Sequence, residues 1–245
     1  SNVGVWGGRR EAGLRRLLEG AEGLIFAQGA AEIRIAVVDN DDDIFVWSIS
    51  ATATTRLLYK ERMTLAASLG IPELDRAITS LDMSVDGRYL LVVLDNQAVV
   101  VWAIDGEQQQ WLWPYPTVEA LASAPAHFHP AQPLVATLQG KRLYVLALQP
   151  GGDMTVVWQS PASSADLAGL TWDRSGKHLL TWGNDGYAHL WRWDDDSQIA
   201  NEIMRLPHND SQGRPPLFDD RVAHLLTIDE AGWGIRLWTI WPGWE

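Results

Sequence analysis

Short runs of alternating apolar residues recur along the chain, and each run closes on one large side chain that we call the anchor. The anchors are Trp47, Trp102, Leu146, Trp191 and Trp238. Successive anchors are 55, 44, 45 and 47 residues apart, and Trp6 lies 41 residues before the first of them. A period of roughly 40–45 residues is the one expected for the four-stranded blades of a propeller.

The positions before each anchor repeat as well. Turn-forming residues stand six positions before the anchors: Asp41, Asn96, Gly140, Asp185 and Gly232. Aliphatic residues stand twelve positions before them: Ile35, Leu90, Leu134, Leu179 and Leu226. Each unit therefore reads as strand, tight turn, strand. Both faces of the second strand are largely apolar, as suits a blade between two neighbouring blades, and only His189 and Arg236 break this pattern.

Two units carry a further hairpin upstream, with glycine where the turn needs a positive φ. These hairpins join Ile78–Met83 to Tyr89–Leu94 and Leu167–Trp172 to His178–Gly183. Fourth strands are expected at Gln108–Trp113 and Met154–Trp158. We predict an all-β protein, a β-propeller of four-stranded antiparallel blades with five or six blades represented. The predicted units of this single domain or fragment are 1–20 (partial), 24–60, 77–114, 118–160, 166–206 and 217–245. Leu14–Leu18 could supply a fourth strand to the last unit and so close the ring.

The stretch Leu170–Trp191, with an Asp-Arg-Ser-Gly-Lys turn followed by Asn-Asp-Gly, resembles a WD repeat, and Leu81–Trp102 resembles one less closely. The resemblance implies a rigid, non-catalytic scaffold that binds proteins or peptides. It also suggests a bacterial-type array that forms part of a larger signalling protein. The chain departs from the family because no anchor is followed by Asp and no Gly-His dipeptide opens a blade. We therefore do not expect the family's Asp-His-Ser/Thr-Trp hydrogen-bond network in its usual form.

One unit points to a second family. The apolar run Leu143–Leu148, followed by Gly151-Gly152 and a closing Trp158, resembles a quinoprotein-type propeller repeat. This resemblance implies the alternative function, a propeller enzyme or a binder of a quinoprotein-like cofactor or ligand with its site in the central channel.

Charge narrows the classes of partner. The net charge of −12 opposes binding to nucleic acid, whose phosphates dominate affinity, and to anionic membrane surfaces. It favours a basic protein or peptide, or other domains of the same parent chain. Cysteine is absent, which excludes thiolate metal sites. No leader or membrane-spanning run is visible, so a cytoplasmic location is the default expectation.

Acidic residues gather in the turns between the second and third strands, which open on one face of a propeller. This candidate partner-binding face contains Asp39, Asp41, Asp42, Asp43, Asp95, Asp185, Asp229 and Glu230, and Tyr115 is a candidate exposed aromatic contact. Lys141 is the only basic residue among these turns. The competing interpretation is that turns favour Asp anyway and that the charge serves solubility.

Candidate metal and catalytic motifs are weak. The run Asp39–Asp43 alternates like a calcium loop but has Ile44 where that loop needs Gly, and His127-x-His129 offers only two ligands. Nucleophile-elbow, zincin and P-loop motifs are absent. We predict no cofactor, no metal and no catalytic residue, and a protein- or peptide-binding scaffold or sensor module as the function.

Overall fold

The computed structural model describes residues 21–28, 32–39, 43–50, 53–60, 78–94, 98–104, 110–113, 125–209, 215–218, 224–228 and 234–239. The chain divides into two compact units, residues 1–75 and 76–245. Strands make up all the regular structure of the described residues. Among these residues, no helix has the length and apolar character needed to cross a membrane.

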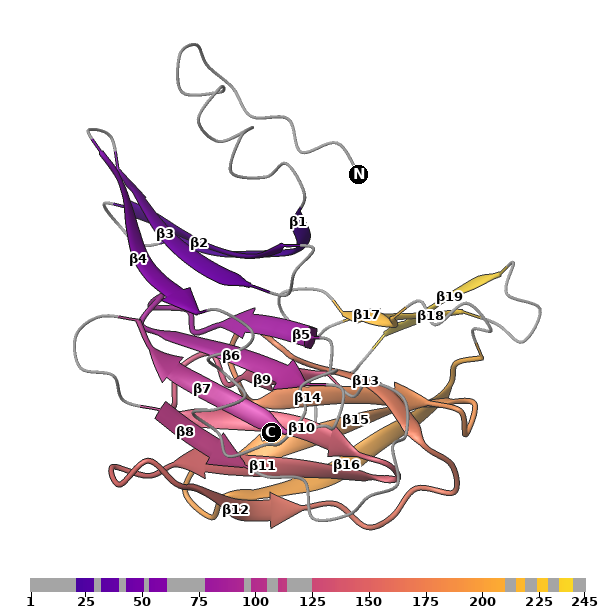
Figure 1. Cartoon of the computed structure of the whole chain (residues 1–245). Helices are drawn as coiled ribbons and strands as arrows, with labels where there is room; N and C mark the ends of the chain where they lie inside the picture. The colour runs from indigo at the N-terminus through magenta and orange to yellow at the C-terminus, as the bar shows by residue number, and fades with distance from the viewer. Residues whose placement is uncertain are drawn as a thin grey trace. The chain divides into compact units, whose positions relative to one another are not determined.

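Five antiparallel sheets follow one another along the chain, and each is a meander in chain order (Figure 1). In the first unit, sheet A contains β1 (Ala21–Gln28), β2 (Glu32–Asp39), β3 (Ile44–Ser50) and β4 (Thr54–Lys60). Sheet B contains β5 (Ile78–Met83), β6 (Tyr89–Leu94), β7 (Val99–Ala103) and β8 (Gln110–Trp113). Sheet C contains β9 (Ala126–Phe128), β10 (Leu134–Gln139), β11 (Arg142–Leu148) and β12 (Met154–Gln159). Sheet D contains β13 (Leu167–Trp172), β14 (His178–Gly183), β15 (Tyr187–Asp194) and β16 (Ile199–Pro207). Sheet E has three strands, β17 (Leu217–Phe218), β18 (His224–Ile228) and β19 (Ile235–Thr239).

These sheets confirm the predicted four-stranded antiparallel units and the two upstream hairpins, whose strands begin and end where the sequence pattern placed them. The expected fourth strands are β8 and β12. The partial unit 1–20, with Trp6 and Leu14–Leu18, lies outside the described residues.

The turns between the first and second strands of sheets B and D are closed by the same kind of serine–aspartate pair. The two residues stand in opposite order along the chain in the two sheets. In sheet B, the Ser84 hydroxyl bonds the Asp86 carboxylate at 2.7 Å and accepts the Tyr89 N–H. In sheet D, the Ser175 hydroxyl donates to Asp173 at 2.6 Å, and Asp173 accepts the His178 N–H. The glycines of these turns, Gly87 and Gly176, have φ of 70° and 76°, as the sequence predicted.

β-Bulges recur at equivalent places in the sheets. The pairing of third and fourth strands shifts by one residue at Val46/Trp47, Val145/Leu146 and Leu190/Trp191, immediately before the anchor each time. The pairing of first and second strands shifts in sheets A, B and D. A bulge adds one residue to one strand and increases the local twist, so the repeat is a repeat of geometry as well as of composition.

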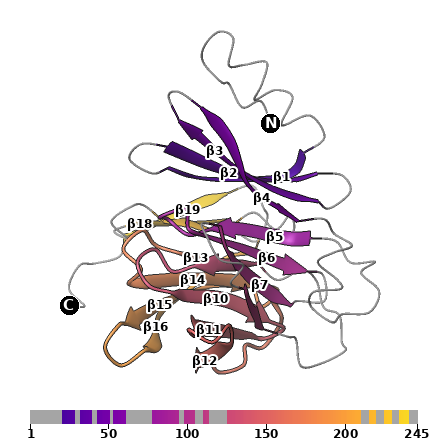
Figure 2. The same cartoon turned by 60° about the vertical axis from the view of Figure 1, so that its left-hand side comes forward.

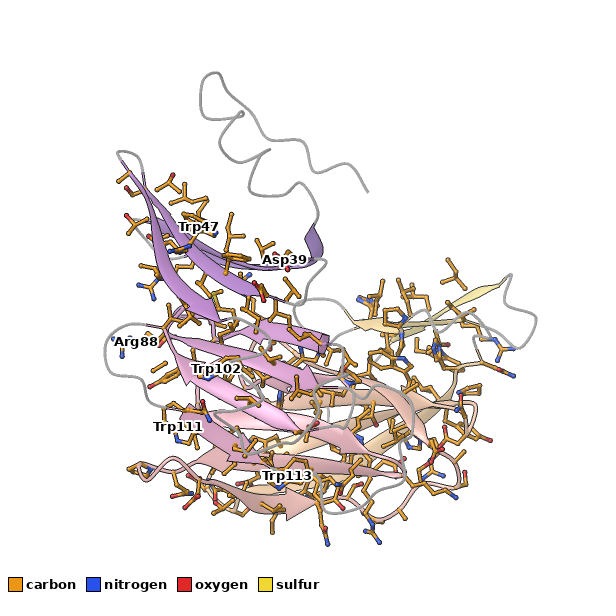
Figure 3. The ribbon with its side chains drawn as sticks, viewed as in Figure 1. Asp39, Trp47, Arg88, Trp102, Trp111 and Trp113 are labelled. Atoms are coloured by element: carbon orange, nitrogen blue, oxygen red, sulfur yellow. The ribbon has the colours of Figure 1, made fainter. Side chains whose placement is uncertain are left out.

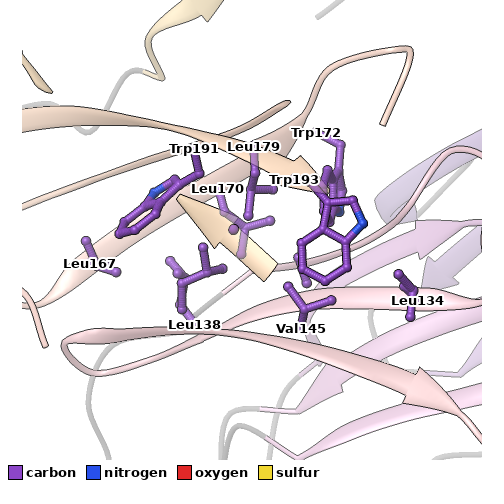
Figure 4. Close-up of a cluster of buried hydrophobic side chains, with 12 residues drawn as sticks. Leu134, Leu138, Val145, Leu167, Leu170, Trp172, Leu179, Trp191 and Trp193 are labelled. Carbon is purple, nitrogen blue, oxygen red and sulfur yellow. The ribbon is translucent and has the colours of Figure 1, made fainter. Parts of the chain in front are cut away.

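Sheets B, C, D and E of the second unit pack face to face in chain order (Figure 2). Val99 and Val101, three and one positions before their anchor, lie in the cluster that joins sheet B to sheet C, with the anchor Leu146 on its other side. Leu143 and Val145 face sheet D, in the buried cluster that also contains the anchor Trp191 (Figure 4). The alternation of a strand therefore directs positions −3 and −1 to the following sheet and the anchor to the preceding one.

Two tryptophans of the outer strand β8 extend this packing. Trp111 is buried, meets Tyr89 edge-on at 5.6 Å and donates its indole N–H to the carbonyl of Gln149 in sheet C at 2.6 Å (Figure 3). Trp113 lies 5.5 Å from Tyr144. Both rings therefore serve inter-sheet packing.

Sheet E departs from the expectation that both faces of a third strand are covered. Leu225 and Trp238 pack on sheet D. On the opposite face, Ile235 and Leu237 are 75% and 64% exposed, and Leu217 is 58% exposed. They occupy the positions that in sheets B, C and D face the following sheet.

Candidate functional site

A pocket of about 50 Å³ lies between sheets C and D, on the side where second and third strands are joined. Its residues come from the β10–β11 turn, the segment that connects β12 to β13, and strands β13, β15 and β16. They are Lys141, Ser160, Pro161, Ala162, Ser163, Leu167, His189, Trp191, Glu202 and Arg205. Leu167 and Trp191 are buried and Lys141 and Arg205 are exposed, so apolar walls are combined with a charged rim.

Backbone hydrogen bonds hold the connecting segment between the two sheets. The N–H of Ser163 donates to the carbonyl of Lys141 at 2.7 Å, and the N–H of Leu167 donates to Gly140 at 2.9 Å. The buried Ser160 hydroxyl accepts the Leu143 N–H and donates to the carbonyl of Pro161. These bonds tie the connecting segment to both sheets, so the fold itself holds the wall of the pocket in place.

Asp185 forms the centre of the buried polar cluster. Its Oδ2 accepts from the Ser163 hydroxyl at 2.8 Å and lies 2.7 Å from Nε2 of His189, and its Oδ1 accepts the Tyr187 N–H. Burial raises the pKa of Asp185, but the hydrogen bonds from Ser163 and His189 together lower it more, so the net shift is downward. The side chain is 2% exposed. Asp185 therefore stabilises the interior of the site as a carboxylate.

His189 lies between two carboxylates. Its Nδ1 is 2.9 Å from Oε1 of Glu202, on the side opposite Asp185. A ring protonated on both nitrogens donates to both carboxylates, whereas a neutral ring donates to only one. The ring is stacked on Trp191 with centroids 6.2 Å apart, and this position explains why the sequence tolerates a histidine in an apolar strand.

Arg205 completes the cluster on the exposed side of Glu202. Its Nε and Nη2 donate to the two carboxylate oxygens at 2.9 and 3.0 Å, and its guanidinium lies 5.9 Å from the Tyr187 ring centroid. Burial raises the pKa of Glu202, and the hydrogen bonds from Arg205 and His189 outweigh it, so the pKa falls overall. The fork-shaped pairing fixes the guanidinium at the mouth of the pocket.

A tryptophan–threonine bond like that of WD repeats is present in two sheets, although the full network of those repeats does not occur in its usual form in sheet D. The indole N–H of Trp191 donates to the Thr181 hydroxyl at 3.0 Å, and Trp238 donates to Thr227 at 2.8 Å. In sheet D the remaining places are filled differently, because Ser163 rather than histidine reaches Asp185. The sequence signal was available: a threonine stands ten or eleven residues before each of these tryptophans.

The candidate metal ligands His127 and His129 have other partners in the fold. His127 lies 3.4 Å from Asp82, whose carboxylate also accepts the N–H groups of Met83 and Phe128. His129 accepts the N–H groups of Ala131 and Gln132 at Nδ1. Within the described ranges, no group of three or more His, Cys, Asp or Glu side chains is placed to hold a metal ion.

The structure describes three residues of the predicted acidic face. Asp39 accepts the Asp43 N–H at 3.0 Å and so closes the β2–β3 turn, while Asp185 is the buried residue of the inter-sheet cluster. Asp185 is thus less available to a partner than the sequence suggested, because a residue in a turn does not reveal which way its side chain points. The remaining candidates lie outside the described residues: Asp41, Asp42, Asp95, Tyr115, Asp229 and Glu230.

Four-stranded antiparallel sheets packed in chain order define the fold class as an all-β propeller arrangement, and the tryptophan–threonine bonds inside two of the sheets resemble those of WD repeats. No protein-family profile matches the chain. The chain is similar to an Arabidopsis thaliana protein named "Cell division cycle 20.6, cofactor of APC complex", with 22% identity over 170 residues. The match covers 69% of this chain and 36% of that relative, so the chain spans about a third of the relative's length. Among solved structures it is similar to the β-propeller domain of Myceliophteria thermophila Cps50 (Swd1), with a TM-score of 0.44, 14% identity, and coverage of 90% of this chain and 83% of that chain.

Proposed function

We propose that the chain is a non-catalytic module that binds a protein or peptide at the face carrying the inter-sheet pocket. The observation that carries this proposal is the pocket itself, a preformed recess with apolar walls and a charged rim between two tightly packed sheets. Preformed recesses that combine apolar surface with a few fixed polar groups are typical of binding sites.

The hydrogen bonds of the cluster favour binding over catalysis. A nucleophilic serine requires a base that takes its proton, usually a histidine held by a carboxylate. Here the Ser163 hydroxyl donates to Asp185, and His189 lies on the far side of the same carboxylate oxygen. A carboxylate whose pKa is lowered is a poor base. The tryptophan of the quinoprotein-like unit, Trp158, lies 5.7 Å from Trp191 and serves packing, which gives the enzyme alternative no support.

The partner, we propose, is basic overall and is attracted by the acidic residues of the turns between second and third strands. The net charge of −12 favours such a partner through long-range attraction. The name of the Arabidopsis relative, a cofactor of a complex, is consistent with a protein partner. We further propose that the chain works in the cytoplasm as part of a larger signalling protein.

Affinity capture with the full chain tests this function. A variant with Asp41, Asp42, Asp95, Asp229 and Glu230 changed to Asn or Gln is compared with a control in which Asp194, Asp195 and Asp196 become Asn. The control residues lie at the β15–β16 turn, where exposed Asp195 and Asp196 can lose charge with little effect on the fold. We expect the wild type and the control to retain a partner that elutes at raised salt, and the first variant to lose it. Equal retention by all three proteins would show that the acidic face is not the binding surface.

A further inference from the structure

Sheet E differs from the sheets before it in the burial of its second strand. In sheets B and C the second strands are buried on both faces, since the residues of Leu90–Leu94 and Leu134–Leu138 are at most 2% exposed. In β18 burial alternates instead: Leu225 and Thr227 are fully buried, and Leu226 between them is 36% exposed. This alternation is that of a sheet with one face on a core and the other face in water.

The exposed side of sheet E is aliphatic rather than polar. Leu217, Leu226 and Leu237 are register partners across the three strands. Ile228 is paired with Ile235 beside them. Paired residues of an antiparallel sheet point to the same side, so these five side chains form one patch, which we call the open face. In sheets B, C and D the same repeat positions are covered by another sheet, so the open face has the composition of a contact between sheets.

The open face carries no carboxylate, lysine or arginine among the described residues of sheet E. Arg236 alternates with Ile235 and Leu237 along β19 and therefore lies on the opposite face. His224, at one end of β18, is the titratable residue that shares the open face. Because the chain has a net charge of −12, two copies repel each other wherever their acidic surfaces meet. An uncharged patch is where identical chains can touch without that repulsion, and it offers nothing to a basic partner.

A second copy supplies a surface that matches the open face. The second strands of sheets B, C and D are buried on both sides, so sheet E has the one open sheet face among the described residues of this unit. A second copy can therefore meet it with the same face, which gives an isologous contact about a two-fold axis. Two such sheets pack about 10 Å apart with their strands nearly aligned. Sheet E already packs in this manner on sheet D, through Leu225 and Trp238.

We propose that the open face of sheet E is a self-association surface, through which two copies of the chain form a two-fold symmetric dimer. The inference goes beyond the proposed function, because the partner site lies between sheets C and D and not on this side of sheet E. The patch is smaller than the standard interface of about 20–30 residues on each partner, so we expect a reversible dimer with a micromolar dissociation constant.

Sedimentation velocity of the full chain at rising concentration tests the dimer. We expect the wild type to pass from the mass of one chain to that of two. Leu237→Lys should weaken the dimer about a hundredfold, because each dimer loses two buried leucines. Raised salt should strengthen the dimer, since it screens the repulsion between two acidic chains. The same salt releases a basic partner, so this measurement separates the dimer from the proposed function.

Val85→Lys is the matched control. Val85 is 63% exposed, close to the 64% of Leu237, but it lies in the β5–β6 turn of sheet B. The substitution changes the charge equally and should leave the dimer intact. Equal weakening by the two lysine variants, or a wild-type chain that stays monomeric at every concentration, would overturn the inference.

Single cysteines give a second measurement, since the chain has no cysteine of its own. Leu226 is the central residue of the row of three leucines, and the centre of a two-fold contact brings identical residues closest together. Leu226→Cys should therefore form a disulfide-linked dimer under mild oxidation, and Val85→Cys should form far less. Equal cross-linking at the two positions would show that the chains meet by collision and not through sheet E.

Discussion

His129 of sheet C donates from Nε2 to the carbonyl of Gly176 in sheet D, at 3.0 Å. The direction of this bond is fixed, because Nδ1 accepts two backbone N–H groups and carries no proton. His129 occupies the same place in its turn as Asp173 in the next one, and it meets Trp172 edge-on at 4.8 Å. One residue thus caps its own turn and holds the turn of the neighbouring sheet.

Stability should fall in mild acid because of this residue. Burial lowers the pKa of His129 below its ordinary 6.5. Between 6.5 and the lower folded pKa, the unfolded chain binds a proton that the folded chain does not, so the free energy of unfolding decreases as pH falls through this window. Urea unfolding of the wild type at pH 7.5 and 5.5 should reveal this loss. His129→Asn, which keeps an acceptor for the turn, should reduce the difference. An undiminished difference in the variant would assign it to other groups.

Alanine substitution at two glycines of sheet D distinguishes the cost of a left-handed backbone from the cost of steric overlap. Gly176 has a φ of 76° and Gly186 one of 80°, but an added Cβ overlaps the His129 ring only at position 176. Gly186→Ala should cost about 1–2 kcal/mol for the left-handed backbone alone. Gly176→Ala should cost about 1–3 kcal/mol more, because overpacking is added. Chemical denaturation measures both, and equal losses would contradict the contact with His129.

The tryptophan–threonine bond of sheet D is expected to stabilise the fold. Thr181→Val preserves shape but leaves the buried indole N–H of Trp191 without its acceptor, at a cost of about 1–3 kcal/mol. Thr171→Val serves as the control, since its hydroxyl contacts only the adjacent carbonyl at 3.3 Å. In a Trp191→Phe background, Thr181→Val should cost much less, and a double-mutant cycle measures this coupling. A cost that is unchanged in that background would show that the hydrogen bond is not its cause.

Because the serine and aspartate of these turns stand in opposite order in sheets B and D, a second substitution in sheet B should restore the stability lost through the first. Ser84→Asp alone brings two carboxylates together in one turn and should destabilise by about 1–2 kcal/mol. Adding Asp86→Ser reproduces the arrangement of Asp173 and Ser175 and should restore most of the loss. Thermal unfolding of the two single variants and the double variant tests this. Additive losses would mean that the two turns are not equivalent.

Substitution of the buried Asp185 should reduce the stability of the fold more than substitution of an exposed aspartate. Asp185→Asn weakens the bonds to Ser163 and His189 and should cost about 1–3 kcal/mol at pH 7. Because the folded pKa is depressed, the contribution of the carboxylate is complete above the unfolded value near 3.8 and disappears as pH falls through the lower folded pKa. Asp195→Asn, at an exposed position, is the control and should change stability little. Similar losses in the two variants would contradict the buried role.

The alternation of apolar residues was sufficient to predict the sheets and their order, because a two-residue period and a turn glycine leave few other arrangements. The cluster around Asp185 could not be predicted in the same way. Ser163, His189 and Glu202 come from three segments, and their meeting depends on how one sheet is seated on the next. The role of His129 was hidden because histidine replaces the aspartate that the repeat has at that position in sheet D.

The bulges before Trp47, Leu146 and Trp191 have a consequence for how such a chain can vary. The distance between anchors ranges from 44 to 55 residues, yet the strand offset at the anchor is the same in these sheets. Length variation is therefore tolerated in the connections and not in the pairing. Removal of the extra residue Val157 would turn every later side chain of β12 to the opposite side. Indels and recombination between repeats are thus permitted only where they leave that offset intact.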